Sequence, residues 1–182
     1  MANKVGRIIV GILIVIAAFV IIYLVLPGQY KNPLTAFIQE KTNDNYSKLV
    51  DPLKAAQVPK NKDFTFGSVF EENTEHSAWT IEELSVDDKG NGTYYVYADG
   101  YNITMELESE ENDDSMKTHT NAHVRCTFLV DKDGSTIKIN NKEIQEGKPV
   151  TPQTIEIDQD TYSSTVKSND YFQKALDCLC GK

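Results

Sequence analysis

The feature that most constrains this chain is a run of nineteen apolar or small residues, from Ile8 to Leu26, without a charged side chain. At about 1.5 Å of rise per residue, a helix of this length spans about 28 Å, close to the roughly 30 Å hydrocarbon core of a bilayer. A helix also satisfies its backbone polar groups internally, as lipid requires. The sequence therefore predicts a transmembrane helix over residues 8–26, which Pro27-Gly28 ends.

Positive charge flanks this segment on one side only, because Lys4 and Arg7 lie in the short tail of residues 1–7. Cytoplasmic flanks carry the excess of Lys and Arg, so we expect a cytoplasmic tail and an extracytoplasmic C-terminal domain. A cleaved signal peptide is the alternative, but its apolar region is about 7–15 residues and ends in small residues. Here the run ends Tyr-Leu-Val-Leu-Pro, so an uncleaved signal-anchor in the cell membrane is predicted.

The rest of the chain is strongly acidic. Beyond residue 30 it carries 16 Lys and Arg against 27 Asp and Glu, a net charge of −11. Nucleic-acid binding needs clustered Lys and Arg that displace counterions from phosphates, so no nucleic-acid partner is expected. The expected partners are the membrane and other envelope proteins or further copies of the chain. The ratio of 16 Lys to 2 Arg is typical of an AT-rich bacterial genome.

Residues 27–62 are predicted to be a helical segment followed by a connector. Asn32-Pro33 has the form of an N-cap with proline at the first helical position, and Asp51-Pro52 repeats this form. We therefore expect one helix over about 33–50, with Asn43-Asp44-Asn45 as a point of interruption, and a short helix over 52–57.

Residues 63–182 are predicted to be the β-rich remainder of a single extracytoplasmic domain. Phe64, Phe66 and Phe70 indicate a first strand, and residues 79–86 a second, with a bulge near Glu82-Glu83. The strongest local pattern is a hairpin over 94–107, whose two-residue turn Asp99-Gly100 pairs Ala98 with Tyr101. The face of this hairpin that is expected to be buried comprises Tyr94, Val96, Ala98, Tyr101, Ile103, Met105 and Leu107.

The last part of the chain adds a second hairpin, a short strand and a helix. Strands over 123–130 and 135–140 flank Asp131-Lys-Asp-Gly134, and a four-residue loop pairs Phe128 with Ile137 and Cys126 with Ile139, all facing inward. A strand at Ile155 and Ile157 and a capped helix over 168–180 follow. The fold class is therefore α+β, an antiparallel meander packed with N-terminal helices and a C-terminal helix, and the alternative is a β-sandwich with peripheral helices.

Two aromatic groups are candidate contact residues. Tyr95 and Tyr97 point outward from a strand, and exposed tyrosines often mark protein contact surfaces. A second possibility is a binding pocket for a small ligand or cell-wall fragment. Its expected lining residues are Trp79, Tyr94, Tyr101 and Phe128.

The cysteines and histidines suggest a metal site only by their spacing. His119, His123 and Cys126 are residue types that zinc accepts. On a strand, however, residues 123 and 126 point to opposite faces, so we expect a buried structural Cys126 and two exposed histidines.

Three cysteines in an extracytoplasmic domain allow one disulfide and one free thiol. Cys178 and Cys180 point about 200° apart on a helix, so a bond between them would be strained. Cys126 paired with Cys178 or with Cys180 is the candidate disulfide, and three reduced thiols are the equal alternative.

Six carboxylates crowd residues 106–114, within a predicted loop over 108–122. Calcium binding is one interpretation of this stretch and a solvated loop is the other. The turn sequences Asp87-Asp-Lys-Gly and Asp131-Lys-Asp-Gly lack the glutamate at the twelfth position of a calcium loop. The sequence also lacks a Gly-rich phosphate loop, a Ser-His-Asp arrangement and an H-E-x-x-H motif. A non-enzyme without cofactor, metal or catalytic residues is therefore expected.

The order of elements resembles that of membrane-anchored nuclear-transport-factor-like domains. One membrane helix, capped helices over 33–57, a curved meander over 64–140 and a closing helix over 168–180 follow one another, as in the inner-membrane scaffold subunits of type IV secretion and conjugation machines. This resemblance implies a non-catalytic role in assembly. Together with the anchor, it leads us to expect protein–protein contacts in a cell-envelope complex such as a secretion or conjugation apparatus.

Overall fold

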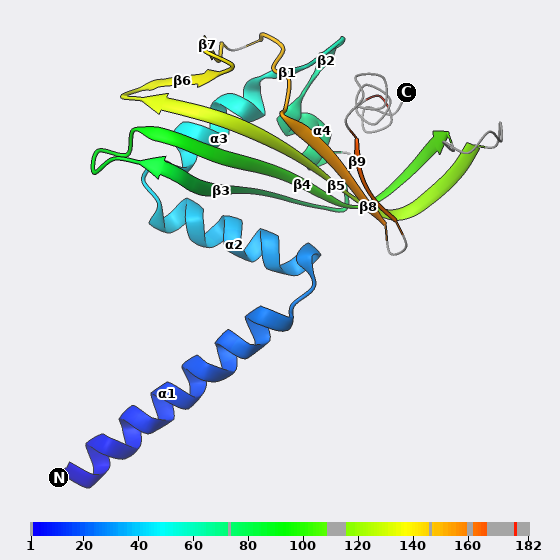
Figure 1. Ribbon diagram of the computed structural model, residues 1–182. Coiled ribbons are helices and arrows are strands. Elements are labelled where there is room, and N and C mark those ends of the chain that lie inside the picture. Colours follow the sequence, from blue (N-terminus) through cyan, green and yellow to red (C-terminus); the bar gives the residue numbers. More distant parts are fainter. Residues whose placement is uncertain are drawn as a thin grey trace. The chain divides into compact units, whose positions relative to one another are not determined.

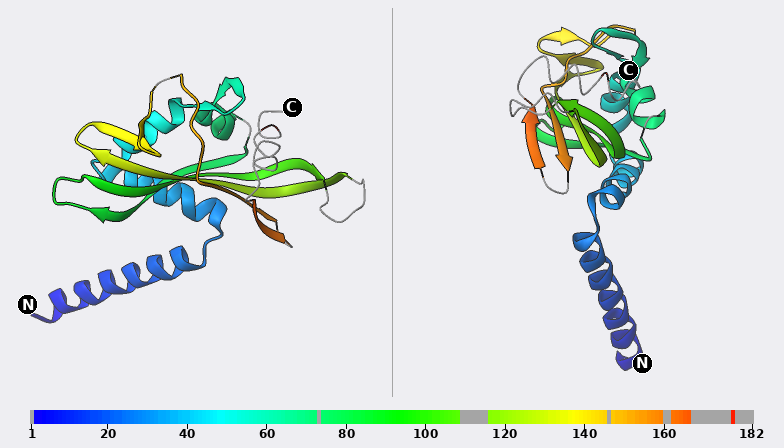
Figure 2. Two further views of the ribbon diagram at one scale, coloured as in Figure 1. Left: turned by 45° about the horizontal axis from the view of Figure 1, so that its top comes forward. Right: turned by 90° about the vertical axis from the view of Figure 1, so that its right-hand side faces the viewer.

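The computed structural model describes residues 2–72, 74–108, 116–145, 147–159, 162–166 and 177, with side chains for residues 9, 12–72, 74–103, 122–145, 147–157 and 177. The chain divides into two compact units, Met1–Lys31 and Asn32–Lys182. Figures 1 and 2 show the ribbon from three sides.

The first unit is dominated by helix α1 (Ala2–Val25), so the predicted helix is confirmed for residues 8–25, and it begins six residues earlier than predicted. Its described Ile, Leu, Val and Phe side chains are exposed, Phe19 and Val25 most strongly. Within the part of the chain that the structure describes, no helix is long and apolar enough to cross a membrane.

Helices α2 (Gly28–Thr42) and α3 (Tyr46–Ala55) replace the predicted helices over 33–50 and 52–57. The N–H groups of Tyr30 and Lys31 donate to the carbonyl of Pro27, so α2 begins before Asn32, and Asn32 is not its N-cap. Pro33 and Pro52 lie inside the two helices. The helices are separated at 43–45, where the backbone N–H of Asn45 donates to the Asn43 side chain at 2.9 Å.

A two-stranded sheet and a short helix follow α3. Strands β1 (Gln57–Val58) and β2 (Asn61–Thr65) pair with each other, and α4 (Phe66–Glu72) begins at once. The predicted first strand is therefore wrong beyond Thr65. Phe66 and Phe70 are four residues apart and share a helix face, and both are fully buried.

The main sheet is antiparallel throughout, in the order β3-β4-β5-β6-β7, with β8 paired to both β5 and β9. The fold class α+β is confirmed (Figure 1). The strands are β3 (His76–Val86), β4 (Gly92–Glu108), β5 (Met116–Asp133), β6 (Thr136–Ile139), β7 (Lys142–Glu143), β8 (Thr154–Gln159) and β9 (Tyr162–Val166).

The core lies between one face of this sheet and helices α3 and α4. Aromatic rings fill its centre: Phe128 meets Phe66 edge-on at 5.0 Å between ring centroids and stacks with Trp79 at 6.2 Å. Fully buried contributors include Leu49, Val50, Leu53, Phe66, Phe70, Tyr94, Val96, Phe128 and Ile155. Burial of these side chains supplies most of the driving force for folding.

Strand β4 runs straight through Asp99-Gly100, so the predicted hairpin over 94–107 is wrong. Ala98 pairs with Trp79 on one side and with Cys126 on the other, instead of with Tyr101. The reversal between β3 and β4 lies at residues 87–91 instead. Of the predicted buried face, Tyr94, Val96, Ala98 and Ile103 are in the core cluster, whereas the side chains of Met105 and Leu107 lie outside the described residues.

Gly100 serves close packing rather than a turn. A Cβ atom at Gly100 would lie 2.6 Å from Cγ2 of Thr74 and 3.1 Å from Cδ1 of Phe70. The left-handed backbone conformation lies two residues further on, at Asn102 with φ of 57°, where the β4–β5 register shifts. A local turn preference was therefore overridden by a tertiary contact.

Of the remaining predictions for the sheet, most are confirmed and one strand pairing is wrong. The bulge expected near Glu82-Glu83 is confirmed as a register shift between Glu83 and Ser85, and the strand at Ile155 and Ile157 is confirmed as β8. The β5–β6 turn has two residues instead of four, so Lys132, not Phe128, pairs with Ile137. The inward positions of Phe128, Ile137, Cys126 and Ile139 are confirmed.

Two further predictions concern segments that the structure describes only in part. The loop over 108–122 is wrong for 116–122, because β4 and β5 stay paired as far as Glu108 and Met116. Of the helix predicted over 168–180, only Asp177 is described, and it is helical. The other residues of that helix lie outside the described part of the chain.

Gly100→Ala is expected to lower the free energy of unfolding by about 1–3 kcal/mol, because the added methyl collides with Thr74. Thr74→Ser removes the colliding Cγ2 and keeps the hydroxyl that donates to the Phe70 carbonyl at 2.6 Å. The double variant should recover much of the loss, as measured by denaturant unfolding. Strictly additive losses would contradict the proposed collision.

Candidate functional site

The sheet face opposite α3 and α4 carries the candidate site, and we call it the outer face. Along β4 and β5, core residues alternate with outward side chains, so each strand contributes every second residue to this face. Cross-strand register places Asp99 opposite Arg125 and Tyr97 opposite Thr127. The outer-face side chains that interact are Glu82, Tyr95, Tyr97, Asp99, Tyr101, His123 and Arg125.

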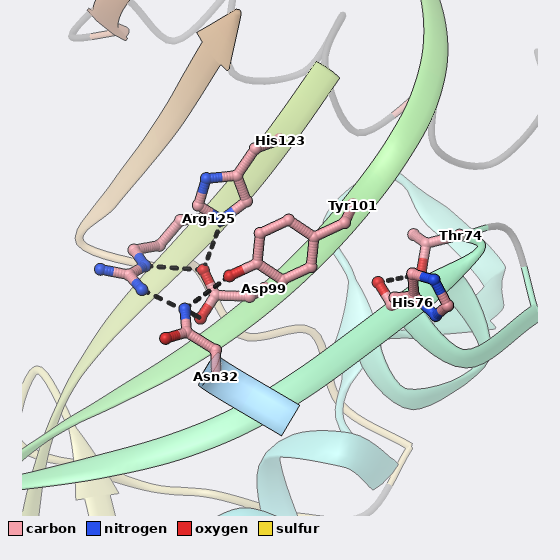
Figure 3. Close-up of polar contacts among 7 residues, drawn as sticks. All are labelled: Asn32, Thr74, His76, Asp99, Tyr101, His123 and Arg125. Carbon is pink, nitrogen blue, oxygen red and sulfur yellow. Dashed lines mark hydrogen bonds and ion pairs between the residues drawn. The ribbon is translucent and has the colours of Figure 1, made fainter. Parts of the chain in front are cut away.

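Asp99 is the centre of this face, and its side chain is fully buried. Arg125 donates to both carboxylate oxygens, from Nε at 2.7 Å and from a terminal nitrogen at 3.1 Å. His123 Nε2 lies 2.6 Å from Oδ1, and Asn32 Nδ2 donates to Oδ2 at 3.2 Å (Figure 3). A carboxylate out of water is tolerated only with such partners, and the two-pronged Arg125 contact is the strongest of them.

Two of the partners of Asp99 remain partly exposed to water. The side chain of His123 is 27% exposed and that of Arg125 is 29% exposed. Burial acts to lower the pKa of Arg125, but its hydrogen bonds and the charge of Asp99 raise that pKa above its ordinary value. Arg125 is therefore a fixed cation at the surface.

Tyr101 packs flat against His123 and closes one side of the cluster. The two rings are parallel within 8° and their centroids are 4.3 Å apart. The Tyr101 hydroxyl accepts a hydrogen bond from Asn32 Nδ2 at 2.5 Å. Burial, with the charge of Asp99, raises the pKa of Tyr101, so its phenol stays neutral. The Tyr101 ring therefore limits how His123 can turn.

Tyr95 and Tyr97 extend the cluster along β4. Arg125 lies over the Tyr97 ring at 4.8 Å from its centroid, and the Tyr97 hydroxyl donates to Glu82 at 2.5 Å. Burial and this contact with Glu82 raise the pKa of Tyr97. The Tyr95 and Tyr97 rings are 5.9 Å apart and both are half-buried. Of the two predicted contact residues, Tyr97 packs against the Arg125 guanidinium, and Tyr95 lies beside Tyr97.

The other predicted groupings do not converge. Cys126 is a free thiol buried in the core, where burial raises its pKa, and His123 is on the outer face. The candidate partners Cys178 and Cys180, and the side chain of His119, lie outside the described residues. Among the residues described, no group of three His, Cys, Asp or Glu side chains could hold a metal ion.

The aromatic quartet proposed as a pocket lining is divided between two layers. Trp79, Tyr94 and Phe128 belong to the packed core cluster, whereas Tyr101 stacks on His123. An open groove of about 220 Å³ is lined by residues of α2, α3, α4 and β3, and of the quartet it includes Trp79. Its lining includes Pro33, Phe37, Lys54, Glu71 and Trp79.

Asp99 was not predicted to be a site residue because Asp99-Gly100 has the form of a turn. Asn32 was predicted to be a helix cap, and no role was predicted for Arg125. The signal was present in the alternation: Tyr95, Tyr97 and Asp99 share one parity on β4, and His123 and Arg125 flank the buried Val124 on β5.

Comparison with known proteins adds no relative. The chain matches no family model, no curated protein and no solved structure in the sets searched.

Asp99→Asn should lower the free energy of unfolding by about 2–3 kcal/mol, because Arg125 would lose its buried counter-charge. The matched control is Glu71→Gln, which breaks the exposed 2.7 Å ion pair with Lys54 and should cost less than about 1 kcal/mol. Denaturant unfolding of the full chain measures both. Equal effects would show that Asp99 does not organise the outer face.

Proposed function

We propose that this chain is a non-enzymatic, single-pass membrane protein whose extracytoplasmic domain makes protein–protein contacts in a cell-envelope complex. The observation that carries the proposal is the outer face, where buried Asp99 holds Arg125 beside Tyr97. Arginine and tyrosine are the residue types most enriched at protein interfaces and at their energetic centres.

The order already present on this face favours binding. Arg125 is fixed by the two hydrogen bonds that it donates to Asp99, and Tyr101 restrains His123 by stacking. A partner would therefore immobilise few rotamers when it binds, which lowers the entropic cost of association. Partial exposure of the Tyr95, Tyr97 and Arg125 side chains leaves area that a partner could cover.

The proposed anchor rests on the sequence of residues 8–26 and on the apolar side chains that α1 exposes. Lys4 and Arg7 favour a cytoplasmic N-terminus, which would place the domain outside. Other envelope proteins or further copies of the chain are the proposed partners. A secretion or conjugation apparatus is the proposed setting, and its support is the element order alone.

A binding module for a small ligand or cell-wall fragment is the second candidate. The observation in its favour is the groove at the β3 edge, where the Trp79 indole Nε1 is buried without a hydrogen-bond partner among the described residues. A ligand confined to this groove would leave the outer face unoccupied, so the two candidates predict different contact residues.

Photo-crosslinking in native membranes tests the contact proposal. A benzophenone amino acid replaces Tyr95 or Tyr97 in the full chain, and exposed Lys142 on β7 is the control position. We expect discrete protein adducts from positions 95 and 97 but none from 142. Arg125→Ala should weaken these adducts about tenfold, as loss of an interface anchor costs at least about 1.4 kcal/mol. An absence of adducts from membrane-embedded protein would refute the contact face.

A further inference from the structure

Helix α2 presents a continuous apolar surface to solvent. Leu34, Phe37 and Ile38 are 41%, 59% and 47% exposed, and their spacing of three and four residues places them on one side of the helix. We call these three residues the α2 stripe. Single exposed apolar residues are ordinary on protein surfaces, but three adjacent large ones on one helix indicate a binding surface.

The opposite side of α2 is fixed to the sheet. Ala36 is buried, and Asn32 donates to Asp99 and Tyr101. The Gln39 side-chain amide pairs with the β3 edge, donating to the Ile81 carbonyl at 2.8 Å and accepting from the Ile81 N–H at 2.9 Å. Rotation of α2 to bury the stripe against the sheet would break these contacts, so Leu34 and Ile38 stay exposed to solvent. Phe37 lies at the edge of the stripe, where it also lines the groove.

The chain itself indicates what covers the stripe. Helix α1 ends at Val25 and α2 begins at Gly28, with two residues between them. Leu34 is therefore within about 20 Å of chain from the end of α1, counting extended linker and helical rise. If α1 is embedded in lipid, the linker limits the distance between the end of that span and the start of α2 to about 10 Å.

We propose that the α2 stripe lies in the membrane interface, with Leu34, Phe37 and Ile38 inserted among the lipid headgroups. This inference rests on the proposed membrane anchor. Helices that lie in the interface bury their apolar side about 5–10 Å into the boundary between headgroups and acyl chains. Lys41, whose Nζ lies 5.8 Å from the Phe37 ring centroid and 2.7 Å from Glu40, can reach the headgroup level from the same side of the helix.

Spin-label accessibility in the full chain tests this placement. Nitroxide labels are attached at Leu34→Cys or Ile38→Cys, with Leu13→Cys as the reference on α1 and Lys48→Cys as a water-exposed control on α3. Cys178 and Cys180 are replaced by Ser, and the buried Cys126 is kept. In vesicles of phosphatidylcholine and phosphatidylglycerol, collisions with lipid-soluble oxygen are compared with collisions with a water-soluble nickel chelate.

We expect oxygen-to-nickel ratios at positions 34 and 38 to be several-fold above that at 48 and to approach that at 13. If position 13 is lipid-exposed while 34 and 38 match position 48, the interfacial placement is refuted and the anchor stands. Shielding of 34 and 38 from both reagents would mean that protein covers the stripe, which also refutes it. A water-exposed position 13 would refute the anchor together with the inference.

Discussion

The buried carboxylate of Asp99 is the interaction that connects the central strands of this domain to helix α2. Asp99 is buried on the outer face of the sheet, where Arg125 and Asn32 donate hydrogen bonds to it and His123 Nε2 lies 2.6 Å from its Oδ1. These three residues come from β5 and from α2, and β4 carries Asp99 itself. Asp99 thus links the central strands to the helix that follows α1.

The fold class and the inward-facing residues followed from sequence because alternation is a property of the strand itself. Val96, Ala98, Cys126 and Phe128 were placed correctly by parity even where the pairing was wrong. The predicted strand pairing was wrong at Asp99-Gly100. Gly100 is required there by its close approach to Thr74, which is more than twenty residues away in sequence. The Phe66 and Phe70 strand failed similarly, since their spacing fits a helix face as well as a strand.

Only part of the candidate site could be predicted from the alternation of residues along the strands. Tyr95 and Tyr97 were identified, because outward aromatics on a strand are visible in the sequence. Their neighbours Arg125 and Asn32 were not, since cross-strand register and the docking of α2 bring them together. Asn32 illustrates the reason: its place before Pro33 suggested a helix cap, but its amide reaches Asp99 and Tyr101 instead. Contacts between distant segments cannot be read from local patterns.

The central claim is that β4 continues through Asp99, which places this carboxylate against Arg125. Nuclear Overhauser contacts in the full chain, isotopically labelled and held in lipid nanodiscs, test it most directly. The account predicts cross-strand contacts from Ala98 to Trp79 and from Asp99 to Arg125. Contacts from Ala98 to Tyr101, across a tight turn at Asp99-Gly100, would contradict it.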